Sequence, residues 1–314
     1  MPESIMAQRF SAEFQHILEK YQKQKENSYK ILELVGTDYT FQNFGTKNLY
    51  ETLINCGTRL AFSKAINDNN NIYHLTGANF CRNRICPMCQ FRRSEKMFAQ
   101  MIQLVRHLEQ DYRFIHLVLT IPNVETGSEL IEAIEKLYKG FNKFWHYADI
   151  KKAFKGCLRC LEISYNYQNY SFHPHLHCLI AVKPSYFNDT RIYLNYDKVR
   201  QLWGKAMQSK QPLQIYLRSC KVGDYVGVAE VCKYCVKPLD LTQGENDIAN
   251  LTVILTLWHT LKGKRFVQKY GVVKEAFNNL FSENDDEYIE QIEVEEKTVM
   301  HVYWDTKTMN YMKE

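Results

Sequence analysis

One short segment with two alternating histidines limits what this chain can fold into more than any other feature of its sequence. His175 and His177 alternate with Leu176, and a wholly apolar run, Cys178 to Val182, follows directly. Because side chains alternate between the two faces of a strand, the two histidines should project from one face about 6.5–7 Å apart. Two imidazoles placed in this way can bind one divalent ion, each through one ring nitrogen. The pattern predicts a buried strand with a metal site on one face.

A usable metal site needs a third ligand, and a neighbouring segment offers an acid. Leu158 to Tyr165 is predicted to be a strand, joined to the histidine strand by the turn-rich Asn166-Tyr-Gln-Asn-Tyr-Ser, so that the two form a hairpin. Glu162 lies among apolar residues of this strand, where a carboxylate needs a partner that a metal would provide. We therefore expect Glu162 to be the third ligand. His173 precedes Pro174, and we expect it to lie outside the ladder.

The remaining elements alternate between strands and helices. The apolar run from Phe114 to Pro122 ends at a proline, which is typical of a buried strand. Helical spacing marks roughly 128–148 and Tyr196 to Met207, and a further helix is predicted from Asp224 to Lys237. Strands interleaved with helices, including a hairpin, indicate an α+β sheet domain with helices on one face.

Three of the ten cysteines fall within nine residues, in Cys81-Arg-Asn-Arg-Ile-Cys86-Pro-Met-Cys89. A turn in the C-x2-C pair brings two thiolates onto one tetrahedral ion, and Cys81 adds a third. Cys56 is the predicted fourth ligand, with His74 as the alternative. Four soft ligands from a short segment indicate structural Zn²⁺, so residues 45–95 are predicted to be a zinc-binding segment.

A second C-x2-C pair, Cys157-Leu-Arg-Cys160, begins a predicted strand. On a strand these two side chains point to opposite faces, so we interpret the pair as packing rather than as a metal site.

The distribution of charge favours a polyanionic partner. The chain carries a net charge of +5, although Ser282 to Lys297 alone holds eight acidic residues and one lysine. The rest is therefore strongly basic, which suits nucleic acid, with a solvated basic surface as the ordinary alternative. The acidic C-terminal tail, residues 281–314, is expected to be loosely ordered, and solvation, autoinhibition or partner contact would each account for it.

The ends of the chain carry no expected targeting or membrane segment. Residues 1–44 form a polar lead-in whose charges interrupt any signal-peptide pattern. No stretch approaches the roughly 18 apolar residues that a membrane helix needs. We therefore expect a cytoplasmic protein, in which clustered cysteines bind metal rather than form disulfides.

A tyrosine on the helix predicted from Asp224 to Lys237 forms a second chemical motif. Glu230, Tyr234 and Lys237 are spaced i, i+4 and i+7 and so share one helix face, and the opposite side of this helix is apolar, which predicts that it packs into the core. A carboxylate one turn from a phenol can accept its proton or activate a water, and tyrosine is a known covalent nucleophile. The chain holds 21 tyrosines, however, so this helix alone does not establish catalysis.

Together these motifs resemble the HUH-type rolling-circle replication initiators of small bacterial plasmids, in the subgroup with one catalytic tyrosine and a glutamate. The resemblance covers roughly Cys56 to Arg265. Its matching segments, in chain order, are Phe80-Cys-Arg-Asn-Arg-Ile-Cys-Pro-Met-Cys-Gln, Ile115-His-Leu-Val-Leu-Thr-Ile-Pro, His173-Pro-His-Leu-His and Glu230-Val-Cys-Lys-Tyr234.

The resemblance implies an HUH endonuclease fold over residues 96–280, with a central antiparallel sheet and ferredoxin-like helices. His175 and His177 would bind Mg²⁺ or Mn²⁺. Tyr234 would attack the scissile phosphate and form a 5′-phosphotyrosine, and Glu230 would activate water in the terminating cleavage. Lys233 and Lys237 would bind phosphate.

The implied partners are single-stranded DNA at a replication origin, the flanking duplex, and the host helicase and polymerase. Two other functions stay open at this point. An HUH transposase or relaxase would use the same chemistry, although the tyrosine follows the histidines here, unlike in most relaxases. A non-catalytic zinc-knuckle protein that binds nucleic acid would explain the cysteines and the charge, but not His175, His177 or Tyr234.

Overall fold

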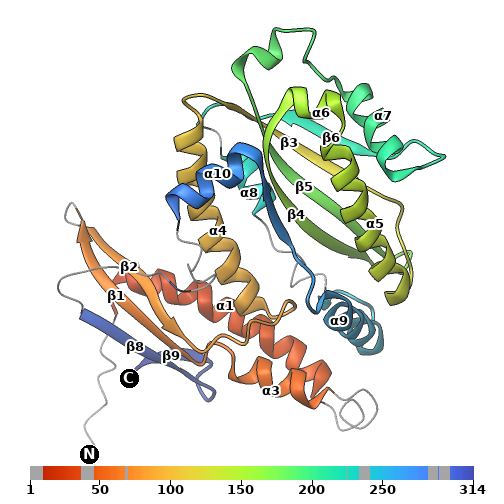
Figure 1. Cartoon of the computed structure of the whole chain (residues 1–314). Helices are drawn as coiled ribbons and strands as arrows, with labels where there is room; N and C mark the ends of the chain where they lie inside the picture. Colours follow the sequence, from red (N-terminus) through yellow and green to blue (C-terminus); the bar gives the residue numbers. More distant parts are fainter. Residues whose placement is uncertain are drawn as a thin grey trace, which may run out of the picture. The chain divides into compact units, whose positions relative to one another are not determined.

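The computed structural model describes residues 10–36, 46–67, 70–223, 225–232, 241–281, 289 and 298–314. The chain divides into two compact units (Figure 1), one formed by Met1–Arg92 with Asp285–Glu314 and the other by Arg93–Asn284. Each unit contains one antiparallel sheet, which confirms the α+β class. No helix among the described residues is long and apolar enough to cross a membrane.

The first unit is a four-stranded sheet with the order β2-β1-β8-β9. Helix α1 packs on it through aromatic rings: Phe14 and Tyr21 contact Phe62 of β1, and Tyr29 stacks on Trp304 of β8. The elements of this unit are α1 (Ala12–Val35), α3 (Lys47–Asn55), β1 (Arg59–Asn67), β2 (Asn70–Ala78), β8 (Thr298–Asp305) and β9 (Asn310–Lys313). Helix α4 (Pro87–Leu108) begins here and continues into the second unit.

The end of the chain differs from the loosely ordered tail expected over residues 281–314. Strand β8 pairs with β1, from Arg59↔Tyr303 to Lys64↔Thr298, so the C-terminal residues belong with the cysteine segment. The alternating apolar residues of Thr298–Asp305 bury one face, because Val302 is only 1% exposed. The acidic run before it lies outside the described residues, apart from Ile289.

The second unit is a five-stranded sheet with the order β6-β3-β5-β4-β7. The expected hairpin is confirmed as β4 paired with β5, and these strands lie inside the sheet. The elements are β3 (Arg113–Thr120), α5 (Gly127–Trp145), α6 (Ala148–Ala153), β4 (Phe154–Asn166), β5 (Ser171–Val182), the 3-10 helix η1 (Pro184–Phe187), α7 (Tyr196–Met207), β6 (Ile215–Ser219), α8 (Val226–Val231), α9 (Asp247–Leu261), β7 (Val267–Tyr270) and α10 (Gly271–Leu280).

Helices cover both faces of this sheet, so the expectation of helices on one face was wrong. On one face, α4, α8 and α10 share a core with Leu158 and Leu179 of the sheet. On the other face, the Arg159 guanidinium lies over the Tyr138 and Phe141 rings of α5, at 4.3 and 5.3 Å from their centroids. The physical reason is the continuous apolar run that ends β5, because a strand buried on both faces does not alternate.

The pairing of β8 with β1 can be tested with two valines of one strand. Val302→Ala removes buried methyl groups and should lower the free energy of unfolding by about 2 kcal/mol. Val299, which is 41% exposed, is the matched control, and Val299→Ala should change it by less than about 0.5 kcal/mol. Urea unfolding followed by circular dichroism measures both, and equal small effects would contradict the packed position of β8.

Candidate functional site

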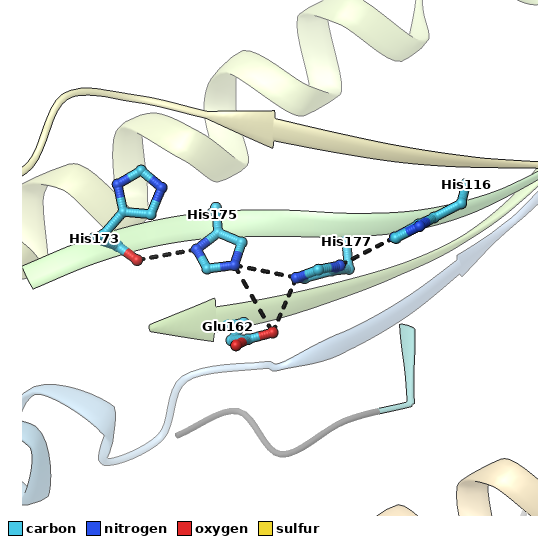
Figure 2. Close-up of polar contacts among 5 residues, drawn as sticks. All are labelled: His116, Glu162, His173, His175 and His177. Atoms are coloured by element: carbon cyan, nitrogen blue, oxygen red, sulfur yellow. Dashed lines mark hydrogen bonds and ion pairs between the residues drawn. The ribbon is translucent and has the colours of Figure 1, made fainter. Parts of the chain in front are cut away.

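Two histidines and one glutamate meet on one face of the second sheet (Figure 2). Glu162 on β4 is the register partner of His175 on β5, and His177 is two residues further along the same face. The Glu162 Oε2 atom lies 2.9 Å from His177 Nε2 and 3.8 Å from His175 Nε2. The two Nε2 atoms are 3.1 Å apart. The three donor atoms are thus close enough to share one small cation.

Each imidazole is oriented by a contact at its other nitrogen. His175 Nδ1 lies 3.0 Å from the His173 carbonyl oxygen, which can only accept, so Nδ1 carries the proton and Nε2 keeps its lone pair. His177 Nδ1 lies 3.1 Å from His116 Nε2, and the two rings are nearly parallel, at 14°. A proton on His177 Nδ1, donated to His116, leaves its Nε2 lone pair facing Glu162. Outer contacts of this kind fix the tautomer and the orientation of metal-binding histidines.

Burial keeps the His175 imidazole in the neutral form that binds a cation. It lowers the pKa of His175 to about 4, against the opposite effect of the Glu162 carboxylate. Burial also lowers the pKa of His173, which Glu162 again opposes. Glu162 itself is buried, and a divalent ion would compensate its charge in this low-dielectric position. The donor set therefore fits a divalent cation.

Two histidines lie where the sequence did not place them. His116 was not selected as a site residue, because only the register of β3 against β5 shows that it lies on the same face as His177: its i+2 neighbour Val118 is paired with His177. His173 lies within the ladder, opposite Ser164, so its expected exclusion was wrong. Its Nδ1 is 2.6 Å from Asn123 Oδ1.

Pro174 is tolerated in β5 because of where β3 ends. The β3–β5 pairing stops at Thr120↔His175. The nearest backbone contact beyond this pair is between Phe172 and Val124. Pro174 lies between the two contacts and has no partner in the ladder on the β3 side, where its missing N–H is therefore not needed.

Glu230 lies at the end of α8, in the wall of a cavity of about 360 Å³ that also contains His116 and His177. The apolar side of α8, with Val228 and Val231, packs into the core, as its sequence predicted. The Ser94 hydroxyl donates to the Cys232 carbonyl oxygen at 2.6 Å, directly after the helix. Packing and hydrogen bonding thus direct Glu230 into the cavity.

The other residues of the tyrosine motif have no described position. Tyr234, Lys233 and Lys237 lie outside the described residues.

The first unit gathers the four cysteines predicted to bind zinc. Cys56 Sγ lies 3.5 Å from both Cys86 Sγ and Cys89 Sγ, and Cys81 Sγ lies 3.7 Å from Cys89 Sγ. All four sulfurs fall within 4.8 Å of one another. The structure brings Cys56, rather than the alternative His74, to this group.

The electrostatics of the cluster also fit a cation. Burial raises the pKa of Cys86 and Cys89, whereas hydrogen bonds from the other three sulfurs lower the pKa of Cys81. Four thiolates would therefore repel one another in this buried position unless a cation held them. The buried Lys25 ammonium adds positive charge nearby and donates to the Cys56 carbonyl oxygen at 2.6 Å. A tetrahedral Zn²⁺ fits four such thiolates.

Comparison with known proteins decides the family. A family model described as "Replication protein" matches residues 72–312. This chain belongs to the replication protein family. The expectation of a replication initiator is confirmed at this level, and no solved structure matches the chain.

Several curated relatives of this replication protein are described as "Protein rep". A "Protein rep" from Lactiplantibacillus plantarum is 32% identical over 277 residues, which cover 82% of this chain and 85% of the relative. A "Protein rep" from Streptococcus pneumoniae serotype 2 is 31% identical, covering 84% and 83%. A "Protein rep" from Staphylococcus aureus is 30% identical over 222 residues, covering 68% of this chain and 95% of the relative.

The contact between His116 and His177 makes a testable prediction about metal binding. His116→Ala removes the acceptor at His177 Nδ1 and should weaken Mn²⁺ binding about 10- to 100-fold, as measured by isothermal titration calorimetry. His116→Gln, whose amide oxygen can accept the same proton, should recover part of this loss. The exposed His146 is the control position, and His146→Ala should bind as wild type. Equal affinities in all variants would show that His177 is oriented without His116.

The cysteine cluster predicts which thiols retain zinc. Cys89→Ser should lose the roughly one Zn²⁺ per chain expected of a structural site, as measured by elemental analysis after dialysis. Cys157 is equally buried but lies in the second unit, so Cys157→Ser should keep the zinc. Zinc retained by Cys89→Ser, or absent from the folded wild type, would contradict the assignment.

Proposed function

We propose that this replication protein initiates rolling-circle replication by nicking and rejoining one DNA strand at an origin. Tyr234 would be the nucleophile, beside a divalent ion held by His175, His177 and Glu162. The observation that carries the proposal is that Glu230 and His177, from motifs far apart in the sequence, line one cavity. A shared active site requires this convergence, whereas a non-catalytic zinc-knuckle protein has no use for it.

The donor set argues for the kind of ion. Mg²⁺ prefers oxygen ligands, whereas imidazole suits transition metals, so two imidazoles and one carboxylate favour Mn²⁺ over Mg²⁺. When bound, the ion would polarise the scissile phosphate and stabilise the charge that develops on it. Three protein donors leave coordination positions for phosphate oxygens, in contrast to the four thiolates of the structural zinc site.

The proposed reaction has two cleavages, in which different residues of this chain act. In the first, the Tyr234 oxygen forms a bond to phosphorus while the bond to the 3′ oxygen breaks, which gives a 5′-phosphotyrosine and a free 3′-hydroxyl. In the terminating cleavage, Glu230 accepts a proton from water as the water oxygen bonds to phosphorus and the bond to the 3′ oxygen breaks, so that no second tyrosine is needed. The 3′-hydroxyl released in this step would attack the 5′-phosphotyrosine, which rejoins the strand and frees the Tyr234 oxygen. Lys233 and Lys237, on the same predicted helix, would neutralise phosphate charge.

The proposal favours an initiator over a transposase or a relaxase. The family model described as "Replication protein" spans most of the chain, which favours an initiator over both alternatives. The histidine motif precedes the tyrosine motif, which argues further against a relaxase. The proposed partner is single-stranded DNA at an origin with its flanking duplex. The host polymerase would extend the exposed 3′-hydroxyl, and the host helicase would unwind the duplex.

A nicking assay tests this function directly. Wild-type protein incubated with Mn²⁺ and single-stranded oligonucleotides from its own replicon's origin should give a covalent protein–DNA band on a denaturing gel. Tyr234→Phe, which lacks the attacking oxygen, should give none, whereas the exposed-tyrosine control Tyr196→Phe should match wild type. Glu230→Gln should still form the adduct but accumulate it, because water is no longer activated.

Two results of this assay would contradict the proposed roles. No adduct from wild type on any origin strand would refute the nicking proposal. Unchanged release from Glu230→Gln would remove Glu230 from the proposed role and leave Tyr234 in place.

A further inference from the structure

The cavity beside His177 has one wall that the proposed chemistry does not use. This wall is β6, one of the two edge strands of the sheet, which contributes Tyr216, Arg218 and Ser219. Val118 of β3 is paired with Tyr216 on one side and with His177 on the other. Paired residues share a face of the sheet, so Tyr216 projects from the same face as the metal-binding imidazoles. Arg218, two residues further, lies on that face too.

Tyr216 offers an aromatic surface that is supported but open. Its ring meets the His116 ring edge-on, with 5.6 Å between the centroids, while 47% of the residue stays exposed. An exposed aromatic ring in the lining of a cavity is a stacking platform for a nucleobase, because every base has a π face that can stack on it. The apolar side chains of Val118 and Val226 line the same cavity and suit a base or sugar.

Arg218 supplies the matching group for a phosphate. It is exposed and is paired with His116 across the β3–β6 ladder, so it lies one strand away from the imidazole that supports His177. A guanidinium forms two parallel hydrogen bonds to phosphate oxygens. One wall therefore presents an aromatic ring and a cation two residues apart, the combination that binds a single nucleotide.

We infer that this cavity is a nucleotide subsite, in which Tyr216 stacks on a base and Arg218 binds a phosphate next to the scissile one. The inference rests on the proposed function, since it takes the scissile phosphate to lie at the His175–His177 site. The cavity volume of about 360 Å³ is within the range of small-ligand pockets, about 300–1,000 Å³. The base must leave its duplex stack to reach Tyr216, so the subsite selects single-stranded DNA.

Binding measured without cleavage tests the subsite. The probe is fluorescein-labelled oligo-dT of about 12 nucleotides, a length that matches typical single-strand site sizes. Its binding is measured by fluorescence anisotropy with full-length protein that carries Tyr234→Phe. Adding Tyr216→Ala should weaken binding at least fivefold, by roughly the worth of one stacked base. Adding Tyr216→Phe, which keeps the ring, should retain the affinity.

The salt dependence separates the two side chains. Arg218→Ala should weaken binding and reduce the slope of log K against log salt concentration by about 0.7, the value for one phosphate contact on a single strand. Tyr216→Ala should leave the slope unchanged, because stacking releases no counterion. The matched controls are Tyr196→Ala and Arg191→Ala, which are exposed, lie outside the cavity lining and should bind as the parent does.

Binding by Tyr216→Ala equal to that of the parent would overturn the subsite, as would equal losses in Tyr216→Ala and Tyr216→Phe. An unchanged slope in Arg218→Ala would remove the phosphate contact. A wild-type covalent adduct with undiminished binding by Tyr216→Ala would refute the subsite alone. No adduct, together with weakened binding by Tyr216→Ala, would refute nicking and leave the subsite standing.

Discussion

The pairing of β4 with β5 is the constraint on which the candidate site depends. Glu162 is opposite His175, and this register alone places a carboxylate and two imidazoles on one face. A slip of one residue would move Glu162 to the opposite face, among the side chains that pack against α5. Because both strands are buried on both faces, such a slip would also bury the wrong side chains, and core packing therefore fixes the geometry of the donor atoms.

The groups that surround the three donor residues are held by rigid elements of the fold. The His173 carbonyl and the His116 ring orient the two imidazoles, and both belong to strands of the sheet. Glu230 comes from a short helix that is held by its apolar side in the core. Sites built on strands and packed helices keep their geometry better than sites built on loops. Strand β6, at an edge of the sheet, lines the cavity beside these groups.

The two units carry metal-donor sets that differ in the number and kind of their donor atoms. Four sulfurs, three of them on buried cysteines and one on the half-buried Cys81, would close a zinc site completely, as structural sites do. Three donors beside a cavity would leave positions open, as catalytic sites do. The C-terminal strands support the closed site, because the Tyr311 hydroxyl donates to the Gly57 carbonyl oxygen at 2.6 Å, next to Cys56. Gly57 has a backbone φ of 65°, a left-handed conformation that residues other than glycine rarely adopt.

The sequence by itself determined the features that depend on local spacing. Alternation placed His175 and His177 on one face, three cysteines within nine residues marked the thiolate cluster, and the apolar side of α8 predicted where Glu230 points. Only the tertiary structure decided that His116 contacts His177, that Cys56 rather than His74 completes the cluster, and that the chain's last strands pair with β1. The physical reason is that strand and helix periods are local, whereas these contacts depend on which distant segments pack together.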